Sequence, residues 1–308
     1  MRTHVRPPIV WTALFAVAAA LPLGCSHAPA SGPSANMTAA LKLREDLKGG
    51  AAAAGGDATA AEAAPTGTGW ATLKGKFTLA GDPPPRPKLA TSGGDMCSAD
   101  GSPILSDRLL VDSATKGIGG VVIYARKPKR VHDSAKQPKE PEVVFDQKGC
   151  RFLSHVAGMQ VGQTMKILNS DAFGHNTKID GVVDANKFNQ TVATGSSVTY
   201  KPLREENAPL KVGCSIHPWM SANVLVRGDG YFAVTGPDGT FEIPNLPAGE
   251  ELEFQVWHEG AGGQGNLVLD QPTLKWNKQG RFKIKLDPDT TRELDLTVPV
   301  AALPAAAG

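Results

Sequence analysis

Residues 241–256 read FEIPNLPAGEELEFQV, and this stretch decides the fold class of the chain. Its two ends, 241–243 and 251–256, alternate apolar and polar side chains with a period of two. That alternation is typical of strands that bury one face. Pro247-Ala-Gly249, between the two runs, has the residue types of a turn. The stretch therefore predicts two strands joined by a turn.

Runs of a similar kind lie on both sides of this stretch. They occupy residues 121–124, 164–168, 197–200, 223–226 and 282–286. Glycine and proline make up about a fifth of the 308 residues, a share above average usage that favours turn-rich β structure. No helical period persists over three turns after residue 69. We therefore expect an all-β chain in which two sandwich-like units meet near residue 229.

The charge balance excludes one broad class of partner. The formal net charge is +2, and two of the basic residues, Arg2 and Arg6, lie in a segment that we expect to be removed. A chain this close to neutrality lacks the basic surplus of nucleic-acid-binding proteins. Its mean hydropathy is negative, which excludes a polytopic membrane protein. The sequence also lacks a nucleophile elbow, a phosphate loop and a dinucleotide fingerprint.

The N-terminal residues 1–25 are typical of a signal peptide, with Arg2 and Arg6 ahead of an apolar run. The ending Leu21-Pro-Leu-Gly-Cys25 resembles a bacterial lipoprotein signal. That resemblance implies cleavage before Cys25, a lipid on this cysteine, and export to the periplasm or cell envelope. Plain secretion with a nearby cleavage site is the alternative. Residues 26–69 are rich in Ala, Gly, Ser, Pro and Thr, and predict a disordered tether.

Two short segments carry soft and borderline metal donors. One reads Val212-Gly-Cys214-Ser-Ile-His217-Pro-Trp-Met220, in a loop between two strand-like runs. The other, Asn169-Ser-Asp-Ala-Phe-Gly-His175-Asn176, ends with a second histidine. A thiolate, two imidazoles and a thioether are the donors of a mononuclear blue-copper site. A single Cys-x-x-His pair is more often a buried cysteine beside a surface histidine, so the ordered set carries the prediction.

These motifs resemble the cupredoxins, the family of plastocyanin and amicyanin, and imply a Greek-key β-sandwich. The resemblance implies one type 1 copper per chain, bound by four residues: His175, Cys214, His217 and Met220. It also implies that Asn176 hydrogen-bonds across to Ser215. The ring edge of His217 is expected to meet solvent inside an apolar rim, made by Pro218 and Trp219, where a redox partner docks. The cupredoxin-like domain is expected over residues 70–228.

A second resemblance covers residues 229–300. The segments Gly230-Tyr-Phe-Ala-Val-Thr-Gly-Pro-Asp-Gly-Thr-Phe-Glu-Ile243 and Leu246-Pro-Ala-Gly-Glu250 are similar to carboxypeptidase-regulatory-like domains. The resemblance implies a small transthyretin-like β-sandwich, usually a structural or adhesive element. Residues 301–308 are expected to form a disordered tail.

The four cysteines fit this assignment. With lipid on Cys25 and copper on Cys214, Cys97 and Cys150 remain as a pair. An exported protein meets an oxidising compartment, which favours a disulfide between them. Two buried thiols are the alternative.

Together these features predict an exported type 1 copper protein that carries single electrons to or from a redox partner at the cell envelope, held at a membrane by its lipid. Catalysis by further copper centres would need His-x-His or His-Cys-His segments, which the sequence lacks, so we do not expect an enzyme. Two alternatives stay open. One is a structural or carbohydrate-binding envelope protein that uses the cupredoxin fold as a scaffold, and the other is a periplasmic copper store.

Overall fold

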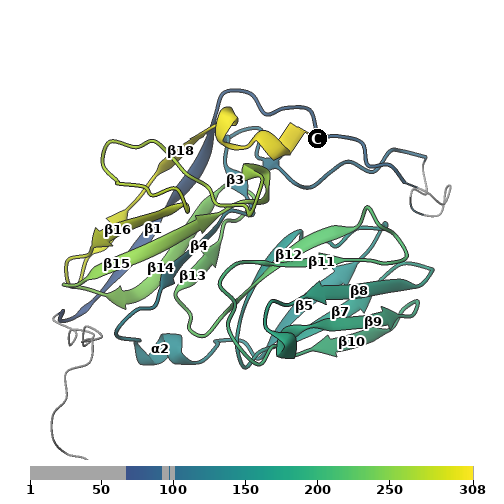
Figure 1. Ribbon diagram of the computed structural model, residues 1–308, viewed down its shortest axis with the longest axis horizontal. Helices are drawn as coiled ribbons and strands as arrows, with labels where there is room; N and C mark the ends of the chain where they lie inside the picture. The colour runs from purple at the N-terminus through teal and green to yellow at the C-terminus, as the bar shows by residue number, and fades with distance from the viewer. Residues whose placement is uncertain (1–66, 92–96, 98–100, 308) are drawn as a thin grey trace, which may run out of the picture. The chain divides into compact units, whose positions relative to one another are not determined.

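The computed structural model describes residues 67–91, 97 and 101–307, which form an almost entirely β structure (Figure 1). The all-β class predicted from the sequence is confirmed. The expected signal peptide, Cys25 and most of the expected tether lie outside the described residues. Within the described ranges, no helix combines the length and the apolar character needed to cross a membrane.

One β-sandwich, the flanking sandwich, combines strands from both ends of the described chain. Its strands are β1 (Trp70–Ala80), β4 (Val122–Arg126), β13 (Phe232–Val234), β14 (Thr240–Pro247), β15 (Glu251–Trp257), β16 (Arg281–Lys285), β17 (Thr291–Glu293) and β18 (Leu296–Pro299). One sheet has the order β14-β1-β17, with β18 also paired to β1, and the other has the order β13-β4-β15-β16. The short strands β2 (Leu110–Val111) and β3 (Ile118–Gly119) pair with each other.

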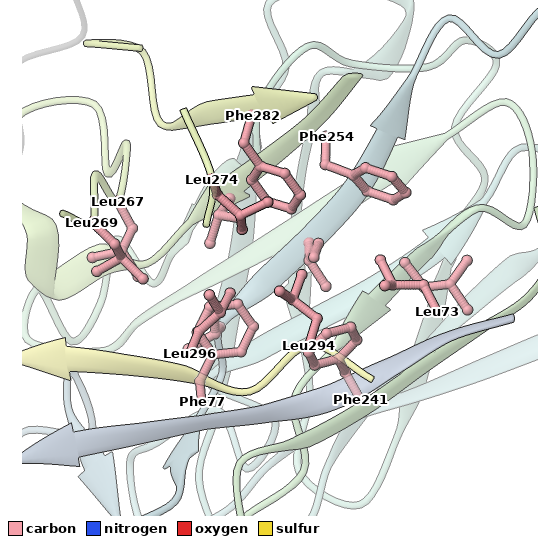
Figure 2. Close-up of a cluster of buried hydrophobic side chains, with 14 of the residues drawn as sticks. Leu73, Phe77, Phe241, Phe254, Leu267, Leu269, Leu274, Phe282, Leu294 and Leu296 are labelled. Carbon is pink, nitrogen blue, oxygen red and sulfur yellow. The ribbon is translucent and has the colours of Figure 1, made fainter. Parts of the chain in front are cut away.

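The strand β1 pairs with elements that follow residue 228, which differs from the expected boundaries. It runs antiparallel to β14, with Leu73 opposite Ile243, and parallel to β18, with Phe77 opposite Leu296. The reason is burial, because Leu73 and Phe77 are fully buried among the leucines and phenylalanines of the flanking sandwich (Figure 2). The division into domains at 70–228 and 229–300 stays a prediction.

The second β-sandwich, the site sandwich, lies within residues 142–227. Its strands are β5 (Glu142–Gln147), β6 (Val156–Gln160), β7 (Thr164–Asn169), β8 (His175–Asp180), β9 (Phe188–Val192), β10 (Ser197–Tyr200), β11 (Leu210–Gly213) and β12 (Ser221–Arg227). The sheets have the orders β10-β7-β5 and β6-β12-β11-β8-β9. Alternate residues of β7, Met165 and Ile167, are fully buried in the core of this sandwich, as period-two alternation requires.

Helical structure among the described residues is short. It comprises α2 (Asp133–Lys136), η2 (Asp184–Asn186), η3 (Glu259–Ala261), η4 (Val300–Ala302) and η5 (Pro304–Ala307). The last two replace most of the tail that we expected to be disordered. Leu303 and Ala306 are buried in the core of the flanking sandwich, and the carbonyl of Ala305 accepts a hydrogen bond from Arg108 Nη1 at 3.1 Å. These contacts hold residues 300–307 in place.

Stability should fall in mild acid because of His258, which is 2% exposed. Its Nδ1 accepts a hydrogen bond from the N–H of Gly260, and burial lowers its pKa from 6.5 to about 4. Between these pH values the unfolded chain binds a proton that the folded state does not, so acidification favours unfolding. Between pH 7 and pH 4.5, His258 alone is expected to lower the free energy of unfolding by about 2 to 3 kcal/mol.

Urea unfolding at the two pH values measures this loss. His258→Asn is the matched control, because asparagine can accept the same hydrogen bond without titrating. We expect the variant to lose about 2 kcal/mol less than the natural chain over the same pH interval. Equal losses in both proteins would show that His258 does not contribute to the pH dependence.

Candidate metal centre

The two segments with metal donors meet because β8 and β11 are antiparallel neighbours. Gly213, at the end of β11, pairs with Lys178 in β8. The start of β8, where His175 lies, is therefore at the same end of the sheet as Cys214, which follows β11. Gly213 also pairs with Ser221 of β12, so residues 214–220 form a hairpin loop at this end of the sheet.

Hydrogen bonds fix both segments. In the hairpin loop, Met220 N–H donates to the carbonyl of His217 at 2.9 Å, and Cys214 N–H donates to the carbonyl of Met220 at 3.4 Å. Ahead of β8, the buried side chain of Asn169 donates to the carbonyls of Phe173 and Val192 at 2.8 and 2.9 Å. The backbone is thus held on both sides of the donor atoms.

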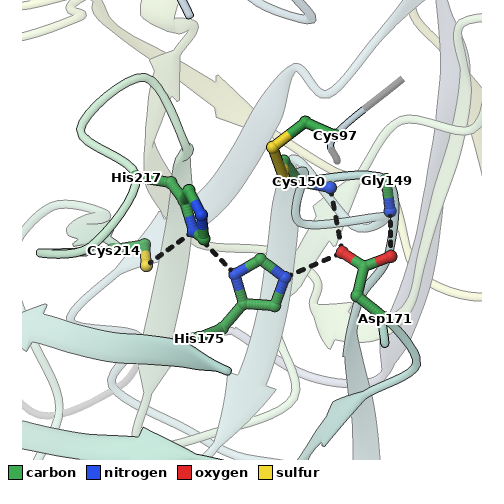
Figure 3. The surroundings of a disulfide bond; sticks show 7 residues. All are labelled: Cys97, Gly149, Cys150, Asp171, His175, Cys214 and His217. Atoms are coloured by element: carbon green, nitrogen blue, oxygen red, sulfur yellow. Dashed lines mark hydrogen bonds and ion pairs between the residues drawn. A yellow bond between two sulfur atoms is a disulfide. The ribbon is translucent and has the colours of Figure 1, made fainter. Parts of the chain in front are cut away.

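The structure brings together three of the four predicted ligands. The donor atoms of His175, Cys214 and His217 all lie within 4.8 Å of one another, and all three residues are buried. The Nδ1 atoms of the two histidines are 3.0 Å apart, and Cys214 Sγ is 3.7 Å from His217 Nδ1 (Figure 3). One nitrogen from each imidazole therefore faces the other imidazole.

This donor set fits a single soft or borderline ion. Metal–nitrogen bonds of about 2.0 Å and metal–sulfur bonds of about 2.3 Å add to more than either observed separation. One ion can therefore contact both members of each of these two pairs. A thiolate with two imidazoles suits copper or zinc and is a poor match for magnesium or calcium, which prefer oxygen ligands.

The surroundings shift the pKa values of the three donors in different directions. Burial would raise the pKa of Cys214, but hydrogen bonding with His175 and with the N–H of Asn176, at 3.3 Å, outweighs burial and lowers the pKa. Burial would lower the pKa of His175, whereas Cys214 and the Asp171 carboxylate outweigh it and raise the pKa. For His217, burial and the neighbouring His175 both lower the pKa. The shifts thus favour the thiolate of Cys214 and the neutral imidazole of His217, whereas the raised pKa of His175 makes proton release part of metal binding at that residue.

Asn176 connects the two segments, as the resemblance implies. Its Oδ1 accepts a hydrogen bond from Ser215 N–H at 3.1 Å. Its amide nitrogen donates to Asn189 Oδ1 at 2.7 Å and to the carbonyl of Gln190 at 3.1 Å, which fixes the side-chain orientation. The backbone N–H of the same residue donates to the Cys214 sulfur. Asn176 therefore connects the hairpin loop that carries Cys214 to the start of β8.

The remaining loop residues divide between core and surface. Met220 is 2% exposed and belongs to the same buried cluster as Cys214. Pro218 is exposed, and the half-buried Trp219 lies with its ring centroid 5.2 Å from that of His217. His217 is only 7% exposed, so its ring is more enclosed than expected. The reason is aromatic packing, since Phe173 also lies against its ring at 5.7 Å.

Cys97 and Cys150 form a disulfide with a Cα–Cα distance of 5.2 Å. A carboxylate that no sequence motif predicts lies beside this disulfide. Asp171 Oδ2 lies 2.7 Å from His175 Nε2, and its carboxylate accepts hydrogen bonds from the N–H groups of Gly149 and Cys150 (Figure 3). Burial would raise the pKa of Asp171, but these three hydrogen bonds hold it below its ordinary value. The position of Asp171 four residues before His175 was the only signal in the sequence.

Comparison with known proteins gives partial matches among solved structures. No family model and no curated protein matches the chain. It is similar to a mutant of amicyanin in the reduced Cu(I) form at pH 4, with 20% identity over 30% of this chain and 87% of that one, at a TM-score of 0.26. A second reduced amicyanin mutant has 19% identity over the same shares, also at a TM-score of 0.26. A copper-containing nitrite reductase from Thermus scotoductus SA-01 has 23% identity over 31% of this chain and 24% of its own, again at 0.26.

Proposed function

We propose that this chain is an exported type 1 copper protein that carries single electrons at the cell envelope. The observation that carries the proposal is the buried group His175, Cys214 and His217, with the two Nδ1 atoms 3.0 Å apart and a thiol beside them. A thiolate and two imidazoles are the equatorial ligands of blue-copper centres. Bound copper supplies one-electron chemistry between Cu(I) and Cu(II).

The chain's own residues have distinct roles in this proposal. Cys214 supplies the thiolate, stabilised by the N–H of Asn176. His175 presents its Nδ1 atom from the start of β8, and His217 presents its Nδ1 atom from the hydrogen-bonded hairpin loop. Met220, buried in the same cluster as Cys214, would supply a thioether sulfur. Because β pairing and the Asn176 tie fix these groups, the donors keep their places when the charge of the centre changes, which favours rapid electron transfer.

Partner binding and location are also part of the proposal. Ile216 is 51% exposed and Pro218 is exposed beside the half-buried Trp219, which together form an apolar surface next to His217. A redox partner that covers this surface would approach one ligand of the centre closely. The leader ending in Cys25 supports export and attachment to a membrane through an N-terminal lipid. We propose electron carriage in place of catalysis because the chain lacks the His-x-His segments of further copper centres.

The test is a Cu(II) titration of the purified full-length chain, followed by visible absorption and electron paramagnetic resonance. We expect saturation at one equivalent, intense visible absorption from the thiolate and a narrow copper hyperfine splitting. A colourless protein that does not retain copper would contradict the proposal and favour the scaffold alternative. Tight Cu(I) binding without a coloured Cu(II) form would instead favour a copper store.

Met220→Gln should keep copper bound and lower the reduction potential. An amide oxygen is a harder donor than a thioether, so it favours Cu(II) over Cu(I). We expect a decrease of roughly 100 mV, which corresponds to a ten- to hundredfold change in relative affinity at 59 mV per decade. Redox titration of the visible band measures the potential. An unchanged potential would show that the Met220 sulfur does not contact the copper.

A further inference from the structure

Asp171 occupies a position that no motif in the sequence predicts. Its carboxylate lies between His175 and the loop that carries Cys150 (Figure 3). The side chain is 10% exposed, and His175 is fully buried. The backbone N–H of Asp171 donates to Asn169 Oδ1 at 3.0 Å, which fixes its own main chain. A carboxylate this enclosed needs compensating hydrogen bonds.

The compensation comes from two consecutive peptide N–H groups. Gly149 N–H donates to Oδ1 at 2.7 Å, and Cys150 N–H donates to Oδ2 at 3.0 Å. Both residues have positive φ angles, 60° and 51°, and their successive N–H groups both donate to the carboxylate. A cysteine in this left-handed region is disfavoured by itself. Here the Cys97 disulfide and the Asp171 carboxylate hold it in place.

The same carboxylate determines the tautomer of His175. An ionised carboxylate only accepts hydrogen bonds, so the proton of the neutral imidazole is placed on Nε2, 2.7 Å away. The other ring nitrogen, Nδ1, then keeps its lone pair. This atom faces Nδ1 of His217, 3.0 Å away. A hydrogen bond to a carboxylate also makes a ligating imidazole more basic, and the negative charge favours the more positive state of a nearby metal.

We infer that Asp171 is a positioning residue of the metal centre, which orients His175 and lowers the reduction potential by stabilising Cu(II), with the Gly149–Cys150 backbone as its anchor. The effect on the potential depends on the proposed copper function. The orientation of His175 is a property of the chain itself.

Asp171→Asn tests the inference, because it removes the charge and keeps the size. Loss of such a partner typically costs ten- to hundredfold in metal affinity. We expect the Cu(II) affinity to fall about tenfold relative to Cu(I), which raises the reduction potential by about 59 mV. Asp184→Asn is the matched control. It makes the same charge change at an exposed carboxylate that pairs with Lys187, and it should leave the potential almost unchanged. Asp171→Glu keeps the negative charge, so its reduction potential should lie between those of the natural chain and Asp171→Asn.

Nitrogen-15 spectra of the histidines in the copper-free full-length chain give an independent readout. We expect His175 to carry its proton on Nε2 in the natural chain, and this preference to weaken in Asp171→Asn, because the amide oxygen is an uncharged and weaker acceptor than the carboxylate. A natural chain with the His175 proton on Nδ1 would overturn the inference even if the variant failed to fold. A blue centre whose potential is the same in Asp171→Asn would overturn it too. A natural chain without a blue centre would overturn the proposed function and the effect on the potential, and the spectra would still decide the orientation of His175.

Discussion

Cys214→Ser is expected to abolish the intense visible absorption of the copper-loaded protein and to lower its Cu(II) affinity at least a hundredfold. The absorption of a blue-copper centre depends on the copper–thiolate bond, and a serine hydroxyl stays protonated at neutral pH and is a far weaker ligand. Cys214 is 4% exposed and is the one free cysteine among the described residues, so no neighbouring thiol can replace it.

The variant should remain folded. Serine is close in size to cysteine, and the Asn176 N–H that contacts the sulfur can donate to the hydroxyl. We expect a cost of about 1 kcal/mol in the free energy of unfolding, of the order of one imperfect buried hydrogen bond. Ser215→Ala is the matched control, since it changes the next residue and retains the backbone N–H that Asn176 accepts. If Cys214→Ser kept the visible band, Cys214 would not be the copper ligand.

The sequence predicts strands well where alternation coincides with strong burial. The run at 251–256 lies in β15, and the run at 282–286 lies in β16 except for its last residue. Phe254 and Phe282 face each other across the pair. The strand β1 is harder to predict, because Lys74-Gly75-Lys76 interrupts its apolar pattern. Its partners β14, β17 and β18 lie far along the chain. Partner choice of this kind depends on which apolar faces are buried together, which local periodicity does not encode.

The candidate site divides in the same way. His175, Cys214 and His217 are predictable because their spacing places donors in two short segments. The contacts that enclose these ligands come from other parts of the chain and leave no local pattern. Asp171 gains its role only when the loop with Gly149 packs against it, and Phe173 only when its ring lies against both histidines. The charges and rings around the ligands depend on such long-range contacts, so the sequence alone does not predict them.

Removal of the Cys97–Cys150 disulfide is expected to destabilise the copper-free protein by about 4 kcal/mol, through the double variant Cys97→Ser/Cys150→Ser. The bridge joins residues 53 positions apart, and a closed loop of this length removes about that much conformational free energy from the unfolded chain. Changing both residues avoids an unpaired thiol in a buried site, since Cys150 is fully buried. Urea unfolding followed by circular dichroism measures the loss.

The copper-free form is essential for this comparison, because bound metal adds its own stabilisation and a thiol reductant would also reduce copper. The natural chain treated with reductant is the matched control, and it should lose about as much stability as the double variant. Equal losses would attribute the effect to the covalent link, whereas a larger loss in the variant would show that the serine side chains disturb the packing around Phe145 and Phe152. A loss below about 1 kcal/mol in both would contradict the loop-entropy argument. The covalent link would then matter mainly for holding Cys150 and its N–H against Asp171.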